Sequence, residues 1–207
     1  MNAAPKIGLV DYGSGNLRSV QKALEVCGAT VFPVHAAPDV ETLDALVVPG
    51  VGSFGDAVAN LRATGHWDVV TAWLREGRPY LGICLGYQLL FEGSEESPDV
   101  EGFGILQGRV VRFPAAVRKI PHMGWNNLEE TRGPLFSGTS QPWVYFVHSF
   151  YPVPAKDGDI SSYCDYEGVR FAASVSRGAL HATQFHPEKS QETGLAVLRG
   201  FLGSLTS

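Results

Sequence analysis

The sequence predicts an α/β protein with a mostly parallel sheet flanked by helices and extra antiparallel strands in the C-terminal half. In the first half, short apolar runs alternate with segments of helical periodicity, which is the order expected of βαβ units. Such units imply helices on both faces of the sheet and an active site at the carboxyl ends of its strands. Beyond Gly102 the pattern changes to short β-like runs separated by turns, which is typical of antiparallel hairpins.

The parallel part of the fold is expected to come from the first half of the chain. Apolar runs predict buried strands at residues 6–10, 30–34 and 45–48 and in the run after Pro79. Apolar residues at helical spacing predict helices at 17–27, 56–61 and 67–76, the first ending at Gly28. The glycine-rich turn at 11–16 is not read as a dinucleotide loop, because the third glycine of that fingerprint would fall at Arg18.

The second half is expected to be richer in antiparallel strands. After a polar loop at 92–98, strands are predicted at 108–113, 144–151, 160–166, 171–175 and 179–185, with a turn at 176–178. Residues 121–126 fall in no obvious regular element. The chain closes with an amphipathic helix at 193–205. No linker or repeat interrupts residues 1–207, so a single domain is expected.

Composition excludes several classes of protein. Net charge is −5, from 16 basic and 21 acidic residues without a block of one sign, so neither nucleic acid nor a membrane surface is an expected partner. No apolar run has transmembrane length and no signal-peptide pattern is present, which favours a cytoplasmic protein. Cys27, Cys84 and Cys164 are odd in number and far apart, which disfavours a disulfide framework or a zinc site.

The strongest local signal is a G-x-C-x-G turn at residues 82–86, the cysteine form of a nucleophile elbow. Glycines two positions either side of Cys84 suit a sharp strand-to-helix turn, because a Cβ there would collide with neighbouring backbone. The helix that follows is expected to carry Leu85, Leu89 and Leu90 on one stripe, and its N-terminus favours the Cys84 thiolate. The alternative for a free cysteine is a small buried apolar residue.

A second glycine-rich loop follows the strand at 45–48 and begins Pro49-Gly50-Val51-Gly52. It lacks the Gly-Lys-Ser/Thr ending of a P-loop. Its backbone N–H groups suit an oxyanion hole, which takes one donor from the residue after the nucleophile, here Leu85, and one from a neighbouring strand-end loop. Taken alone, the loop is equally compatible with a merely flexible connection.

Six histidines are candidates for the general base that would act on Cys84. Structural roles are expected for those without an acidic companion close by, namely His35, His66, His122 and His181. His148 would be near the cleft only if its strand borders it. His186 and Glu188 are separated by the rigid Pro187, and in an extended segment residues two apart point the same way. A carboxylate there can fix the imidazole tautomer, so Cys84, His186 and Glu188 form a candidate triad.

These motifs resemble the class I (triad) glutamine amidotransferases, which have a flavodoxin-like fold. More narrowly, they are similar to the glutaminase subunits of imidazole glycerol phosphate synthase. The narrower resemblance rests on residues 11–19, 49–52, 121–126 and 184–190 together with the elbow, and so spans nearly the whole chain. It implies hydrolysis of glutamine to glutamate and ammonia, through a γ-glutamyl thioester on Cys84, with no metal and no cofactor.

The resemblance also implies roles for individual residues. By motif position, Gln88, Glu96, Ser149 and Phe150 would line the glutamine site, with the carboxylate of Glu96 suited to the α-ammonium group. Val51, Gly52 and the Leu85 amide would lie beside the γ-carbonyl. In such enzymes the loop at 49–52 is expected to stay unproductive until a ligand binds the partner, which would require the Val51 amide to turn.

The partner implied by the resemblance is a (β/α)8-barrel cyclase subunit, which receives the ammonia through its barrel and makes imidazole glycerol phosphate and AICAR in histidine biosynthesis. Residues that resemble positions at or near this contact are Tyr145, Lys189, Trp125 and Asn126. The alternative interpretation is that the lysine is simply solvated and that the aromatic rings are packed within the fold.

Three other functions remain open from the sequence. A glutaminase of another pathway would be expected to lack the stretches 11–19 and 121–126. A stand-alone cysteine hydrolase related to peptidases would also fit the elbow and the α/β order, but it would hydrolyse its substrate without a partner. A non-enzymatic scaffold is disfavoured by an intact set of Cys84, His186 and Glu188.

Overall fold

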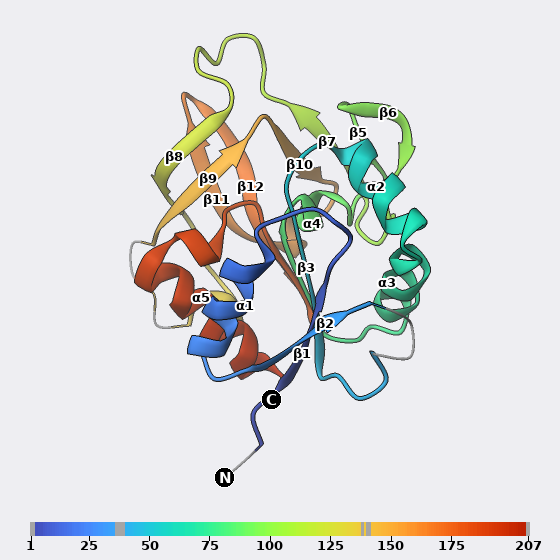
Figure 1. The fold of residues 1–207 in the computed structure, drawn as a ribbon. Coiled ribbons are helices and arrows are strands. Elements are labelled where there is room, and N and C mark those ends of the chain that lie inside the picture. Colours follow the sequence, from blue (N-terminus) through green and yellow to red (C-terminus); the bar gives the residue numbers. More distant parts are fainter. Residues whose placement is uncertain (1–2, 36–39, 138, 140–141, 206–207) are drawn as a thin grey trace.

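The computed structural model describes residues 3–35, 40–137, 139 and 142–205. Its central sheet has the strand order β11-β12-β13-β4-β3-β1-β2 (Figure 1). The parallel strands are β1 (Lys6–Val10), β2 (Thr30–Val34), β3 (Ala45–Gly50), β4 (Tyr80–Cys84) and β13 (Leu180–Thr183). Strands β12 (Val169–Arg177) and β11 (Ile160–Tyr166) extend the β13 edge antiparallel. The predicted mostly parallel sheet with antiparallel additions is confirmed.

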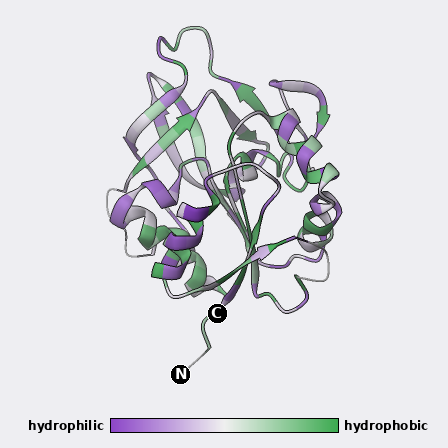
Figure 2. Ribbon diagram, in the orientation of Figure 1, coloured by the Kyte–Doolittle hydropathy of each residue, from purple (hydrophilic) through white to green (hydrophobic). Residues whose placement is uncertain are grey.

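Helices cover both faces of this sheet. Helices α1 (Leu17–Val26) and α5 (Gln191–Ser204) lie on one side, and α2 (Phe54–Ala63) and α3 (His66–Arg75) lie on the other (Figure 1). The helices follow the predicted ranges, with ends shifted by one or two residues. Helix ribbons in Figure 2 mix green and purple, as expected of helices with one apolar and one polar side. No helix in the described ranges is long and apolar enough to cross a membrane.

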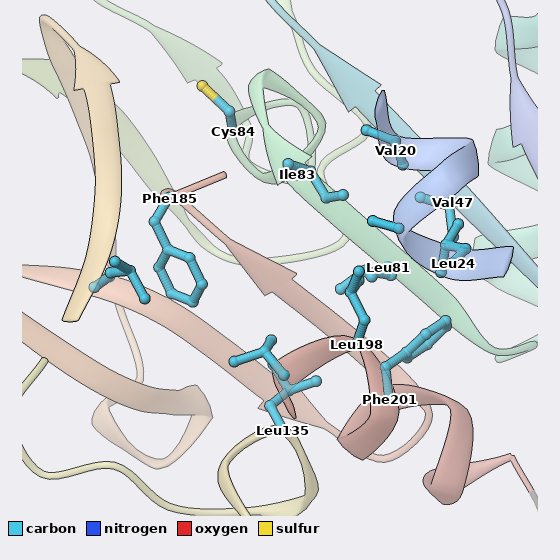
Figure 3. Packing of buried hydrophobic residues seen from close by; sticks show 14 of the residues in the cluster. Val20, Leu24, Val47, Leu81, Ile83, Cys84, Leu135, Phe185, Leu198 and Phe201 are labelled. Carbon is cyan, nitrogen blue, oxygen red and sulfur yellow. The ribbon is translucent and has the colours of Figure 1, made fainter. Parts of the chain in front are cut away.

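The core is divided by the sheet because alternate residues of a strand face opposite sides. Val47 of β3 and Leu81 of β4 pack with Leu198 and Phe201 of α5 (Figure 3). The residues next to Val47 and Leu81 in their strands face the other side of the sheet. There they form a second hydrophobic cluster with residues of α2 and α3. Both faces of β3 and β4 are therefore buried, which explains why these strands read as continuous apolar runs.

The remaining strands gather beyond the carboxyl ends of the parallel strands (Figure 1). Strands β10 (Phe150–Pro154), β7 (Gly108–Arg112), β5 (Gly93–Ser94) and β6 (Ser97–Glu101) form one small sheet. Strands β8 (His122–Asn127) and β9 (Trp143–His148) form another. Single-turn helices complete the description: α4 (Leu85–Gln88), η2 (Pro134–Phe136), η3 (Asp157–Asp159) and η4 (Pro187–Lys189). Of these elements, α4, β9, β10 and η4 contribute lining residues to the cavity described below.

Several local predictions for this upper region are wrong. The expected loop at 92–98 contains β5 and the start of β6, and the stretch 121–126, expected to be irregular, lies mostly in β8. Strand β8 exists because it pairs antiparallel with β9, so that His122 lies opposite His148. A partner distant in sequence therefore decided β8, whereas β5 and β6 pair mainly with each other. Short polar or glycine-containing segments carry no local β signal of their own.

Other boundaries also differ, and the strands expected at 171–175 and 179–185 run over Val169–Arg177 and Leu180–Thr183. The predicted strand 144–151 is two strands in different sheets, broken at Ser149. The turn expected at 176–178 lies at 178–179, because Ser176 and Arg177 still pair with β13. The helix expected after the elbow is a single turn, Leu85–Gln88, which leaves little helix dipole to favour the Cys84 thiolate.

Candidate active site

Cys84 ends β4 in a backbone conformation that few non-glycine residues adopt, with φ of 55° and ψ of −103°. The flanking glycines allow this turn: a Cβ on Gly86 would lie 1.8 Å from the Val48 carbonyl oxygen, and one on Gly82 would lie 2.6 Å from the Gly86 oxygen. In Figure 3 the Cys84 sulfur points away from the packed core at the end of β4. The predicted elbow geometry is therefore present.

The elbow opens into a cavity of about 440 Å³ at the carboxyl ends of β3 and β4. Most residues that the sequence assigned to the site line it: Cys84, Leu85, Val51, Gly52, Gln88, Glu96, Ser149, Phe150 and Lys189. Pro121, Val147 and His148, which had no assigned role, complete the lining. Strand β9 thus does border the cleft, which was the condition set for His148.

His186 and Glu188 form the predicted acid–base pair, with 2.8 Å between His186 Nδ1 and Glu188 Oε1, and both side chains are buried. The prediction placed both residues on an extended segment. They meet instead through the turn η4, because Pro187 starts a helical turn after the extended His186. Burial lowers the pKa of His186, but Cys84 and Glu188 outweigh it and raise the pKa to about 10. The Cys84 side chain is among the groups that raise this pKa, which places it close to the imidazole, although His186 Nε2 makes no hydrogen bond of standard geometry within the described residues.

The loop at 49–52, predicted to form an oxyanion hole, is held by the first strand-to-helix turn of the chain. The Val51 N–H donates to Ser14 Oγ over 3.3 Å, and the Ser14 hydroxyl donates to the Val51 carbonyl. Gly52 has φ of 100°, which favours glycine, and a Cβ on Gly50 would lie 2.1 Å from the Tyr12 hydroxyl. The Val51 amide is thus committed to Ser14 in this structure.

Glu96 reaches the cavity from the turn between β5 and β6. Its Oε2 accepts a hydrogen bond from the Phe54 N–H over 2.7 Å, which holds the carboxylate at the start of α2. The Gln88 side chain donates from Nε2 to the Phe150 carbonyl over 3.0 Å and to Gln184 Oε1 over 3.1 Å. Its own Oε1 is the atom of the amide left for another donor.

Gln184 is the site residue that sequence reasoning missed. Its side chain is fully buried and its Nε2 lies 3.6 Å from Cys84 Sγ as a hydrogen-bond donor. In sequence it lies two positions before His186, within a recognised stretch. That spacing was a usable signal, but only the neighbouring strands β4 and β13 bring Gln184 beside Cys84.

Four of the other histidines are held by hydrogen bonds. His122 Nδ1 lies 3.1 Å from His148 Nε2, and His148 Nδ1 lies 2.9 Å from the Phe150 carbonyl oxygen. Burial lowers the pKa of His148 to about 3 and that of His122 to about 4, so both are neutral at pH 7. His66 bonds Thr64 and the Val34 carbonyl, and His181 bonds Ser176, outside the cavity lining.

The predicted contact residues lie mainly on the outer face of β8 and β9, here called the β8–β9 face. The Trp125 and Tyr145 rings are 6.3 Å apart, and Lys189 Nζ lies 5.9 Å from the Tyr145 ring. Trp125 is 44% exposed, and Met123 and Trp143 on the same face are more exposed still. Asn126 is tied down, because its Nδ2 donates to the Asp165 carbonyl over 2.9 Å.

Cys27 and Cys164 do not line this cavity. Cys27 Sγ donates to the Leu195 carbonyl over 3.5 Å, and burial raises the pKa of Cys164 to about 12. Within the described residues, no group of three or more His, Cys, Asp or Glu side chains is arranged to hold a metal ion.

A cysteine elbow and a glycine-rich strand-end loop around one cavity, with a buried His–Glu pair next to the cysteine, define a thiol amidase of the α/β class. Residues 8–203 match the family glutamine amidotransferase class-I, and the chain belongs to this family. A solved structure described as a glutamine amidotransferase shares the fold, with a TM-score of 0.76, 23% identity and coverage of 97% of this chain and 99% of that chain.

Closer relatives place the chain within that family. It is 45% identical over 206 residues to imidazole glycerol phosphate synthase subunit HisH of Geobacillus thermodenitrificans, covering 97% of this chain and 96% of the relative. It is 49% identical over 208 residues to the HisH subunit of Deinococcus radiodurans, covering 97% and 94%. A hisHF protein of Arabidopsis thaliana is 44% identical over 200 residues, which are 95% of this chain but 34% of that longer one. The chain therefore belongs to the HisH group.

Proposed function

We propose that this chain is the glutaminase subunit of an imidazole glycerol phosphate synthase, acting in histidine biosynthesis as a single domain (residues 1–207) in the cytoplasm. It hydrolyses glutamine to glutamate and ammonia and delivers the ammonia to a cyclase partner, which makes imidazole glycerol phosphate and AICAR. The observation that carries the proposal is Cys84 on its elbow beside the buried His186–Glu188 pair, in a chain related to HisH subunits over nearly its whole length.

The triad supports hydrolysis of glutamine in two steps. Glu188 accepts from His186 Nδ1–H, and His186, whose pKa is raised to about 10, holds the proton given up by the Cys84 thiol, so that Cys84 Sγ attacks the side-chain amide carbon of glutamine as a thiolate. The tetrahedral intermediate expels ammonia, which takes that proton from His186, and a γ-glutamyl thioester remains. His186 then removes a proton from water, the hydroxide attacks the thioester, and glutamate leaves as Cys84 is regenerated.

The cavity lining suits free glutamine. The carboxylate of Glu96, held at one oxygen by the Phe54 N–H, offers its other oxygen to the α-ammonium group. Gln88 contributes an acceptor, because both hydrogens of its amide are already used. Ser149 and the Phe150 backbone complete the proposed substrate site from the break between β9 and β10.

The oxyanion hole is proposed to form from the Leu85 amide and the Val51–Gly52 segment, and to be incomplete at rest. Two hydrogen bonds to Ser14 hold the Val51 peptide, so its N–H must leave Ser14 before it can stabilise an oxyanion. The Val51 N–H belongs to the peptide that joins Gly50 to Val51, and a glycine at position 50 makes rotation of that peptide inexpensive. The resting chain is therefore expected to hydrolyse glutamine slowly until a partner and its ligand rearrange this loop.

The proposed partner is a (β/α)8-barrel cyclase subunit docked over the cavity mouth and the β8–β9 face. Val147 and Lys189 line the cavity and adjoin this face, where Trp125 and Tyr145 form an exposed aromatic pair. Exposed aromatic residues of this kind are common anchors of protein interfaces. Support also comes from the hisHF relative, in which the region like this chain is part of a longer polypeptide.

The decisive experiment measures glutamate release from glutamine by this chain alone, then with the cyclase subunit and its ribulosyl nucleotide substrate. The expected result is almost no glutamate release by the chain alone and strong glutamate release in the ternary mixture. Cys84→Ala should abolish glutamine use while the partner's ammonia-driven reaction continues. High activity of the isolated chain, unchanged by partner or ligand, would instead indicate a free-standing hydrolase.

A further inference from the structure

We infer that Gln184 is a positioning residue that donates a hydrogen bond to the Cys84 thiolate and connects the nucleophile to the wall of the glutamine site. This inference rests on the proposed function for its catalytic meaning. The contact itself is a feature of the fold: parallel pairing of β4 and β13 sets Thr183 beside Ile83, so the next residues, Gln184 and Cys84, come side by side. Gln184 Nε2 then lies 3.6 Å from Cys84 Sγ.

The orientation of the Gln184 amide follows from a backbone group that can only accept. The Phe150 carbonyl oxygen lies 3.0 Å from the Gln88 side chain, so Gln88 must present its NH₂ group there. The second hydrogen of that NH₂ group points to Gln184 over 3.1 Å, so Gln184 must present its oxygen to Gln88. Only the NH₂ group of Gln184 is then left to face Cys84, and it can only donate.

Burial makes this donor effective. Gln184 is fully buried and Gln88 is nearly so, and an amide in such surroundings is retained only when its polar atoms are bonded. A hydrogen bond to a charged acceptor is stronger than one to a neutral acceptor, so the contact favours the thiolate over the thiol. The single-turn α4 supplies little dipole at this position, which leaves the Gln184 amide as a main source of positive potential besides His186.

The backbone of Gln184 is held independently of its side chain. Its N–H donates to the Ala173 carbonyl over 2.8 Å, across to β12. Replacement by Met, which has a similar length and no donor, should therefore remove the contact to Cys84 without displacing the strand. Thr183→Val is the matched control: it removes a buried hydrogen bond from the adjacent residue, whose hydroxyl donates to the Phe185 carbonyl and not to Cys84.

The test measures iodoacetamide alkylation of Cys84 against pH, read by mass spectrometry of the Cys84 peptide so that Cys27 and Cys164 do not contribute. The alkylation midpoint of Gln184→Met is expected to move upward by about one to two pH units, the size set by a hydrogen bond to a charged group. Thr183→Val should keep the wild-type midpoint. In glutamine hydrolysis, kcat of Gln184→Met at pH 7 should fall about tenfold or more with little change in KM.

A midpoint that is the same in Gln184→Met and in wild type would overturn the inference. If Gln184→Met does not fold, the wild-type chain provides the test. The NMR signal of the Gln184 side-chain amide proton should shift with the same pH midpoint as Cys84 alkylation. An amide signal that does not change with this midpoint would refute the contact. Neither readout needs turnover. A wild-type chain that never hydrolyses glutamine would defeat the proposed function and leave this test intact.

Discussion

Helix α5 offers a graded test of how the fold supports the catalytic turn, because its glycines meet different surroundings. A Cβ on Gly194 would lie 1.8 Å from the carbonyl oxygen of Pro187, in the turn η4 that carries Glu188. A Cβ on Gly200 would lie 2.4 Å from the Pro134 oxygen, in η2, whereas one on Gly203 meets nothing within 4 Å. All three positions lie in the same helix, so intrinsic helix propensity changes equally in the three alanine variants.

The magnitudes follow from this comparison. Gly203→Ala should raise the free energy of unfolding by up to about 1 kcal/mol. Gly194→Ala and Gly200→Ala gain the same propensity but overpack a backbone oxygen, which typically costs about 1–3 kcal/mol and here falls at the upper end. Each should therefore be about 2–3 kcal/mol less stable than Gly203→Ala, a difference of roughly 4–12 °C in Tm for a chain of this size.

Activity should separate the two destabilised variants. Relief of the Gly194 overlap requires η4 to move by more than about 1 Å, which disturbs the 2.8 Å bond between His186 and Glu188. A misplacement of about 1 Å costs on the order of 100-fold in rate. Gly200→Ala displaces only η2, so it should lose stability and keep its kcat.

The assays are urea unfolding of each variant and glutamine hydrolysis in the presence of the proposed partner and its ligand, well below the unfolding midpoint. The reasoning is refuted if Gly194→Ala is as stable as Gly203→Ala. It is equally refuted if Gly194→Ala and Gly200→Ala lose the same fraction of kcat.

Other predictions concern the acid–base pair, the oxyanion loop and the docking face. The raised pKa of His186 stabilises the fold fully below about pH 6.5, and this stabilisation is lost as pH rises through about 10. Glu188→Gln should therefore lose less stability than wild type between these pH values in urea titrations, and equal losses would contradict this. Ser14→Ala removes the hydroxyl that holds the Val51 N–H, and it should raise partner-independent glutamine hydrolysis by about 2- to 10-fold, the equivalent of one hydrogen bond. An unchanged basal rate would show that Ser14 does not keep the loop in its resting conformation. Trp125→Ala should weaken binding to the cyclase subunit by about 30-fold in calorimetry while its urea midpoint stays at the wild-type value, whereas an unchanged Kd would remove this residue from the interface.

Features of this protein that depend on local spacing could be predicted from the sequence. The G-x-C-x-G turn predicted the elbow because the glycines on either side of Cys84 are needed wherever a strand turns sharply into a helix. His186 and Glu188 meet because one proline separates them, although the turn they form is helical and not extended. Continuous apolar runs predicted β1, β3 and β4 because strands buried on both faces have no polar side.

Strands whose existence depends on distant pairing were missed. Residues 121–126 contain glycine, asparagine and histidine and resemble a loop, yet most of them form β8 because β9 supplies a partner. Strands β5 and β6 were missed for a different reason: they are short, pair mainly with each other, and sit in what looks like a polar loop. A strand of this kind has no alternating apolar pattern from which it could be predicted.

By itself, then, the sequence determined the class of fold and predicted a candidate nucleophile and its acid–base partners, because each motif consists of residues that are near neighbours in the chain. Tertiary structure alone decided that Gln184 meets Cys84, 100 residues away, and that Ser14 holds Val51, 37 residues away. The physical reason is strand order. Only when β13 and β3 take their places on either side of β4 do the ends of separate strands meet at one edge, and no local pattern specifies which strands become neighbours.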